Sequence, residues 1–135
     1  MNDLIKVSEI PGYNKILEEL ENRAFGDVKD WDEFELRFLR GVGLKHTTYI
    51  NWKSGVRQFF DSYLEMKVSP FRVTIEMIEK FYDETAQTRS PQTASVRITQ
   101  LKSFFRRFCE RFPMCHNPFR DLNGKLQRKF KDPIR

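Results

Sequence analysis

Acidic residues are scarce in the last third of the sequence. Residues 89–135 hold three, Glu110, Asp121 and Asp132, against twelve Lys and Arg, which gives a net charge of +9. Residues 1–88 hold sixteen acidic and twelve basic residues, a net charge of −4. An imbalance of this size opposes compaction unless a partner supplies counter-charge. It therefore indicates contact with a polyanion, either nucleic acid or a membrane surface, and a merely solvated basic face is the simpler alternative.

Long apolar runs are also lacking. No stretch resembles a membrane span, and the first six residues lack the basic stretch and apolar run that mark a secretory signal peptide. We therefore expect a cytoplasmic, nucleoid-associated protein with no membrane partner. The chain has 135 residues, which is the size of one ordinary domain and enough to bury a core.

Cysteine and the motifs of catalysis are sparse as well. The two cysteines, Cys109 and Cys115, are separated by "ERFPM", a spacing that fits neither a C-x-x-C redox pair nor half of a zinc site. Cys109 is expected to be a small core residue. The chain has no G-x-x-x-x-G-K-[ST], H-E-x-x-H or G-x-S-x-G motif. We expect no catalytic residue, no metal and no cofactor.

Helical patterns, by contrast, occupy most of the chain. Five segments repeat apolar residues at helical spacing, and none shows the alternation of a strand. They begin after plausible capping residues and are joined by short breaks. The expected helices cover residues 12–26, 30–41, 46–66, 74–87 and 90–112. The fold class that follows is all-α, a compact bundle of four to five helices, because each apolar stripe can be buried only against another helix.

The segment 90–112 differs from the others because it has two distinct faces. One narrow arc is apolar and is expected to face the core; its residues are Ala94, Ile98, Leu101, Phe105, Phe108 and Phe112. The arc beside it is basic or polar, with Thr93, Arg97, Gln100, Arg107 and Arg111. Lys and Arg neutralise phosphates, while Arg and Gln can form paired hydrogen bonds to guanine or adenine. We expect Arg97 and Gln100 to contact bases and Arg107 to contact phosphate.

Two further groups of basic residues complete the expected DNA-binding surface. Lys53 and Arg57 lie one turn apart beside the aromatic face of the third helix, with His46 further back on the same side. Lys125, Arg128 and Lys129 lie in the basic segment that follows the fifth helix. If the flanks of the third and fifth helices meet across a groove, both would face one ligand. The simpler alternative is that Lys53 pairs with nearby acids and that Thr93 and Gln100 are ordinary surface residues.

From about Asp30 onward, these segments together resemble a known family, the tyrosine recombinases of the phage-integrase type. The part that they resemble is the core-binding domain, a SAM-like helical domain that precedes the catalytic domain. The resemblance rests on the order and spacing of "HTTYINWKSGVRQFFDSYL", "VTIEMIEKFYDE", "SPQTASVRITQLKSFFRRF", "NPF" and "LQRKFKDPIR". It implies that residues 30–119 form a DNA-binding domain and that residues 120–135 form a basic linker toward a catalytic domain. Residues 1–29 are then an acidic, helical N-terminal extension.

The resemblance also implies a role and a set of partners. In the family, this domain and the catalytic domain form a clamp around the core recombination site, and the helices that match 46–66 and 90–112 lie toward the major groove. The nucleophilic Tyr and its Arg, Lys and His partners belong to the following domain, so this chain alone is expected not to be an enzyme. The implied partners are double-stranded DNA, the catalytic domain of the same polypeptide if it is longer, and other recombinase protomers on DNA; the free form is a monomer.

A second function remains open from the residues. The chain could be a helical protein-interaction module, in which the acidic first helix binds a partner and the basic end only improves solubility. Retention on duplex DNA at moderate salt separates the two functions, because counterion release drives binding only if the basic residues contact phosphates.

Overall fold

The computed structural model describes residues 12–40 and 46–121, and the described part contains no β-strand. Its helices are α1 (Tyr13–Phe25), α2 (Trp31–Glu35), α3 (His46–Arg57), α4 (Ile75–Thr88) and α5 (Pro91–Arg111). Wider π-helical turns continue two of them, η2 (Leu36–Arg40) after α2 and η3 (Gln58–Tyr63) after α3. Two short 3₁₀ helices, η4 (Pro70–Arg72) and η5 (Pro118–Asp121), lie in the connections. The all-α prediction is confirmed, and the described helices include none that is long and apolar enough to cross a membrane.

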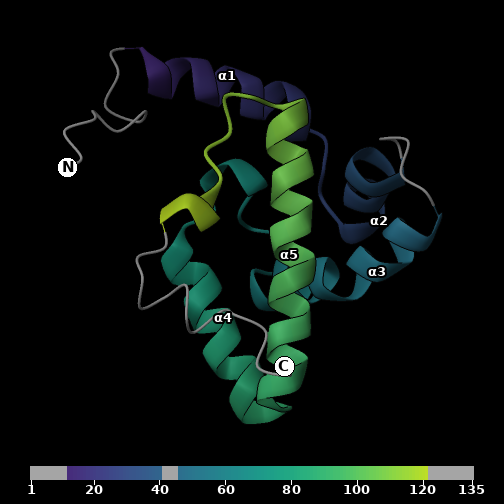
Figure 1. Ribbon diagram of the computed structural model, residues 1–135. Coiled ribbons are helices and arrows are strands. Elements are labelled where there is room, and N and C mark those ends of the chain that lie inside the picture. The colour runs from purple at the N-terminus through teal and green to yellow at the C-terminus, as the bar shows by residue number, and fades with distance from the viewer. Residues whose placement is uncertain (1–11, 41–45, 122–135) are drawn as a thin grey trace.

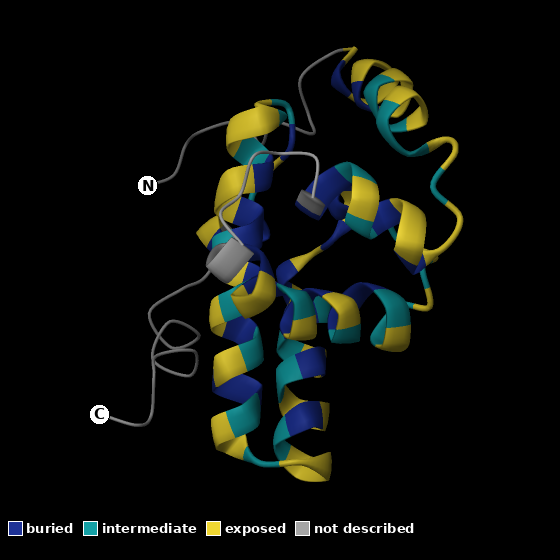
Figure 2. Ribbon diagram, turned by 90° about the vertical axis from the view of Figure 1, so that its right-hand side faces the viewer, coloured by how far each residue is buried: buried dark blue, intermediate teal, exposed yellow. Residues whose placement is uncertain are grey.

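The longest helix, α5, organises the fold. In Figure 1, α4 runs beside α5 in the opposite direction, α3 crosses α5 near its middle, and α1 lies across its C-terminal end. Buried and exposed residues alternate along the helices, as Figure 2 shows, which is the pattern of amphipathic helices around a shared core. Every described helix therefore has contact with α5 or with a helix that packs on it.

Three of the helices start at side-chain caps that the sequence predicts. Asp30, Thr74 and Ser90 each accept a hydrogen bond from a backbone N–H in the first turn of α2, α4 and α5, respectively. These bonds satisfy donors that a helix start would otherwise leave unpaired. Pro91 follows Ser90 as the first helical residue, where its missing N–H has no cost. The caps fix where α2, α4 and α5 begin.

The core is built mainly from phenylalanine. Phe34, Phe59, Phe60, Phe104 and Phe105 are fully buried. Their rings form contacts between helices: Phe60 of η3 lies 5.7 Å from Phe104 of α5 in an edge-to-face arrangement, and Phe34 of α2 lies 4.9 Å from Phe60. Aromatic rings favour such tilted contacts over face-to-face stacking. The core therefore ties α2, α3 and α5 into one unit.

One predicted core residue is wrong, and its neighbour explains why. Helical periodicity within residues 12–26 predicts that Ile16 faces inward together with Leu17, Leu20 and Ala24, but the Ile16 side chain is 53% exposed, whereas Tyr13 is 5% exposed. The Tyr13 hydroxyl donates to the Met114 carbonyl at 2.7 Å, which turns α1 so that Tyr13 and Leu17 face the core. The described part of the acidic extension thus packs on the rest of the domain.

Candidate nucleic-acid interface

The crossing of α3 and α5 brings Gly55 and Gln100 into direct contact. Gly55 of α3 is buried at the crossing, and its backbone N–H donates to Oε1 of Gln100 at 2.6 Å. A Cβ atom at position 55 would lie 2.4 Å from that oxygen and 2.9 Å from the backbone oxygen of Arg97. The two helices can approach this closely only because position 55 is glycine. The two flanks expected to meet do not do so: Lys53 and Arg57 lie on the opposite side of α3 from Gly55, and the crossing at Gly55 is tight, not an open groove.

Gly55 was not among the residues expected from the sequence, although a signal was available. A glycine inside a helix costs about 1 kcal/mol relative to alanine, so its presence usually has a packing reason. Its partner could not be predicted from the sequence, because the contact joins positions 45 residues apart.

The crossing also gives Gln100 a structural role. Its carbonyl oxygen is engaged, which leaves its amide N–H groups for any contact with a base.

The cations of α3 already have acidic neighbours. Nζ of Lys53 lies 3.6 Å from Oε2 of Glu35, which also accepts a hydrogen bond from the Tyr49 hydroxyl. Nε of Arg57 lies 3.3 Å from Oδ2 of Asp61, one turn later on the same helix. This outcome matches the simpler alternative for Lys53. These pairs reduce the charge that α3 presents to a polyanion.

The cations of α5 have no acidic partner in an ion pair among the residues that the structure describes. The helix contains Arg97, Lys102, Arg106, Arg107 and Arg111 and a single acid, Glu110. None of the ion pairs among the described residues includes a residue of α5. Partial burial, and then the like charge of Arg89, lower the pKa of the Arg97 guanidinium from its ordinary value. The positive charge of α5 is left for the surroundings to neutralise.

Two of these cations, Lys102 and Arg106, are not among the DNA-binding residues predicted from the sequence. That prediction considered only one polar arc of the helix. At about 100° per residue, Lys102 and Arg106 lie on one edge of the exposed side of α5, and Arg107 and Arg111 lie on the other. The small polar residues Thr99 and Ser103 lie between the two edges, and so does the one acid of the helix, Glu110, near its C-terminal end. We use the name α5 strip for the basic and hydroxyl residues of this surface, which are Thr99, Lys102, Ser103, Arg106, Arg107 and Arg111.

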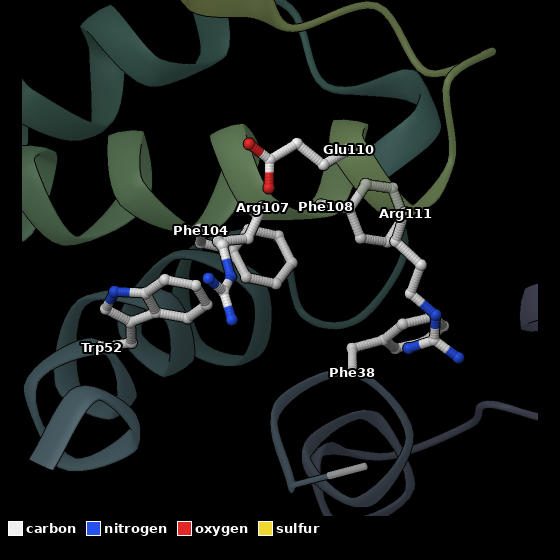
Figure 3. Close-up of a pocket in the computed structure, with 7 residues that line it drawn as sticks. All are labelled: Phe38, Trp52, Phe104, Arg107, Phe108, Glu110 and Arg111. Atoms are coloured by element: carbon white, nitrogen blue, oxygen red, sulfur yellow. The ribbon is translucent and has the colours of Figure 1, made fainter. Parts of the chain in front are cut away.

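A groove with a volume of about 510 Å³ runs along the Arg107 edge of the strip. Figure 3 shows its seven lining residues: Phe38, Trp52, Phe104, Arg107, Phe108, Glu110 and Arg111. The Arg111 guanidinium lies 5.8 Å from the Phe38 ring centre, 5.1 Å from that of Phe112, and donates to the Arg37 carbonyl at 3.1 Å. Arg111 is thus held in place, whereas Arg107 has no ion-pair partner within the described ranges.

The remaining predicted residues divide into two groups. Thr93 lies in the first turn of α5, where its N–H donates to Ser90 Oγ at 3.0 Å and its hydroxyl accepts from the same oxygen at 3.0 Å. Thr93 is therefore part of the helix cap. The His46 side chain and residues Lys125, Arg128 and Lys129 lie outside what the structure describes. Their contact with DNA stays a prediction.

The arrangement suits electrostatic binding more than chemistry. Within the described residues, no group of three or more His, Cys, Asp or Glu is placed to hold a metal ion. The α5 strip offers guanidinium and ammonium donors on both edges and hydroxyl groups between them.

Comparison with protein-family models, with curated proteins and with solved structures finds no match to this chain.

Proposed function

We propose that this protein binds duplex DNA with the α5 strip facing the major groove. One observation carries the proposal: the cations of α5 lack ion-pair partners among the described residues, whereas those of α3 have them. The major groove is about 12 Å wide and admits an α-helix. With α5 in the groove, Lys102 and Arg106 reach phosphates on one side, and Arg107 and Arg111 reach those on the other.

The α5 strip also suggests which groups read the sequence. Thr99 and Ser103 lie at the centre of the strip and therefore nearest the base edges. Short hydroxyl side chains can donate to or accept from any base, and a threonine methyl group can contact thymine. Such contacts discriminate weakly, so most of the affinity comes from phosphates and depends strongly on salt.

The resemblance to tyrosine recombinases supports a more specific form of the proposal. In that form, the chain is the core-binding domain of a site-specific recombinase and holds one side of the recombination site. It contributes no nucleophile, because its sequence has no H-x-x-R motif and the described tyrosines serve the fold: Tyr13 and Tyr49 are buried, and Tyr63 and Tyr82 are partly buried. We expect no covalent adduct with a nicked suicide substrate. An adduct formed by this chain alone would contradict the non-catalytic role.

The experiment that tests DNA binding compares two triple variants with the same change in net charge. The first removes strip cations, Lys102→Ala, Arg106→Ala and Arg107→Ala. The second, a control, removes exposed cations elsewhere, Lys15→Ala, Lys67→Ala and Lys80→Ala. The measurement is the affinity for random duplex DNA, by fluorescence anisotropy, across a series of salt concentrations.

The strip triple variant should lower the slope of log affinity against log salt by about 0.9 for each lost phosphate contact. The control should keep nearly the full slope, because its cations lie on other elements. Equal losses in both variants would mean that net charge alone attracts DNA. Absence of wild-type binding at low salt would leave the protein-interaction function as the better one.

A further inference from the structure

The two cysteines line one cavity at the C-terminal end of α5. The cavity has a volume of about 410 Å³ and is also lined by Arg106, Arg120 and His116. Cys109 lies in the last turns of α5 and is partly exposed, whereas Cys115 is 5% exposed. A small molecule that enters the cavity therefore meets Cys109 before Cys115.

The backbone returns toward α5 between the two cysteines. The Phe112 N–H closes the last turn on the Phe108 carbonyl at 2.8 Å, and the Cys115 N–H then donates to the Phe112 carbonyl at 2.8 Å. Sγ of Cys115 lies 3.7 Å from the carbonyl oxygens of both Pro70 and His116. These contacts hold the Cys115 thiol on the inner wall of the cavity that Cys109 also lines.

The electrostatic surroundings shift the pKa values of the two thiols in opposite directions. The hydrogen bond from the Cys115 thiol lowers the pKa of Cys109; burial opposes this change, and the nearby charge of Arg120 supports it. The same hydrogen bond and burial raise the pKa of Cys115. The proton therefore stays on Cys115 and the thiolate forms on Cys109. The thiolate is the nucleophilic form of cysteine.

We propose that Cys109 is a peroxide-reactive thiol and that Cys115 resolves its oxidised form to an intramolecular disulfide. The proposal does not depend on DNA binding. A spacing of five residues fits no C-x-x-C motif, but the turn after Phe112 places the two side chains in one cavity.

The reaction balances with a hydroperoxide as the oxidant. The Cys109 thiolate attacks one peroxide oxygen, so that an S–O bond forms, the O–O bond breaks and, with hydrogen peroxide, hydroxide leaves and takes a proton to become water. The product is a sulfenic acid at Cys109. Loss of the negative charge at Cys109 removes one cause of the raised pKa at Cys115. The Cys115 sulfur then attacks Cys109, the S–S bond forms, and the S–O bond breaks. Its proton leaves with the hydroxyl group as a second water.

The test treats the whole chain with limiting hydrogen peroxide and maps the products by mass spectrometry without reduction. We expect a Cys109–Cys115 disulfide, seen as the loss of two hydrogens and reversed by dithiothreitol. Cys115→Ser should instead accumulate a sulfenic acid at Cys109 that dimedone traps. Cys109→Ser should react many-fold more slowly, since Cys115 is buried.

A pair of charge variants checks the electrostatic part. Arg120→Ala removes the charge near Cys109 and should slow the peroxide reaction several-fold, while Lys80→Ala, an exposed position of α4 that does not line the cavity, should leave the rate unchanged. Circular dichroism of each variant establishes that it is folded. Equal reactivity of Cys109→Ser and the wild type would overturn the proposal, and so would over-oxidation of Cys109 without a disulfide.

Discussion

The helices α3 and α5 cross at Gly55 and both carry cations beside aromatic residues, yet they handle these charges differently. On α3, Lys53 and Arg57 each have a carboxylate within reach, supplied by Glu35 and Asp61. On α5, no ion pair among the described residues involves Arg107, which lines the same groove as Trp52 of α3. The comparison teaches that a count of basic residues does not identify a binding surface. The positions of the acids decide which cations remain available.

The largest expected effect is the difference in stability between a substitution on the buried side of α5 and one on its exposed side. Phe105→Ala empties a fully buried position and should lower the free energy of unfolding by about 3–5 kcal/mol. The matched change Val96→Ala, at a 47% exposed position of the same helix, should cost within about 0.5 kcal/mol. Urea unfolding followed by circular dichroism measures both. Similar losses would mean that α5 is not packed as the structure describes.

The second prediction concerns the crossing that joins the two helices. On helix propensity alone, Gly55→Ala should stabilise α3 by about 1 kcal/mol. The added Cβ would clash with the Arg97 carbonyl, so we expect a net loss of about 1–3 kcal/mol instead. Ser54→Ala, exposed on the same helix, is the control and should change stability by at most about 0.5 kcal/mol. A more stable Gly55→Ala variant would contradict the close crossing.

The third prediction tests the difference in charge between the helices directly. Arg107→Ala should lower the slope of log affinity against log salt by about one unit on any duplex, because one phosphate contact is lost. Arg57→Ala should lower it by clearly less, since Asp61 already neutralises that guanidinium. Equal slopes for the two variants would remove the distinction between α3 and α5.

The smallest effect is expected at Lys53. Its side chain is 43% exposed and its ammonium group lies 3.6 Å from Glu35, so Lys53→Ala should lower the free energy of unfolding by about 0.2–1 kcal/mol. The loss should shrink in high salt, where exposed pairs are screened. Thermal unfolding at two salt concentrations provides the measurement. A salt-independent loss would show that the packing of the Lys53 side chain contributes more than its charge.

Sequence patterns predicted the helices well because caps and apolar periodicity are local properties. Ser90 and Pro91, for example, specify the start of α5 without reference to any other part of the chain. The residues of the apolar arc, from Ala94 to Phe108, are buried as predicted. Local patterns could not place Phe104, which lies toward the basic arc but is 1% exposed. Its burial depends on Trp52 of α3, whose ring centre lies 6.0 Å away.

The candidate site was less predictable for the same physical reason. Whether a lysine or arginine is neutralised depends on acids that other elements supply, as Glu35 of α2 does for Lys53. The role of Gln100 depends on the backbone of a different helix. Lys102 and Arg106 could have been identified, because their position on the exposed side of α5 follows from helical periodicity alone.

The contact between Gly55 and Gln100 also constrains how this sequence can change over evolution. A larger residue at position 55 needs the space that the Gln100 side chain fills, and a residue without an acceptor at position 100 leaves the Gly55 N–H without its partner. The two positions should therefore vary together in sequences that keep this fold, with a small residue at 100 whenever 55 gains a side chain. Positions 97 and 107 carry no such mutual restriction through their side chains. Paired substitution at positions 55 and 100 would thus show that related sequences keep the helix crossing, whether or not they also keep the DNA-binding residues.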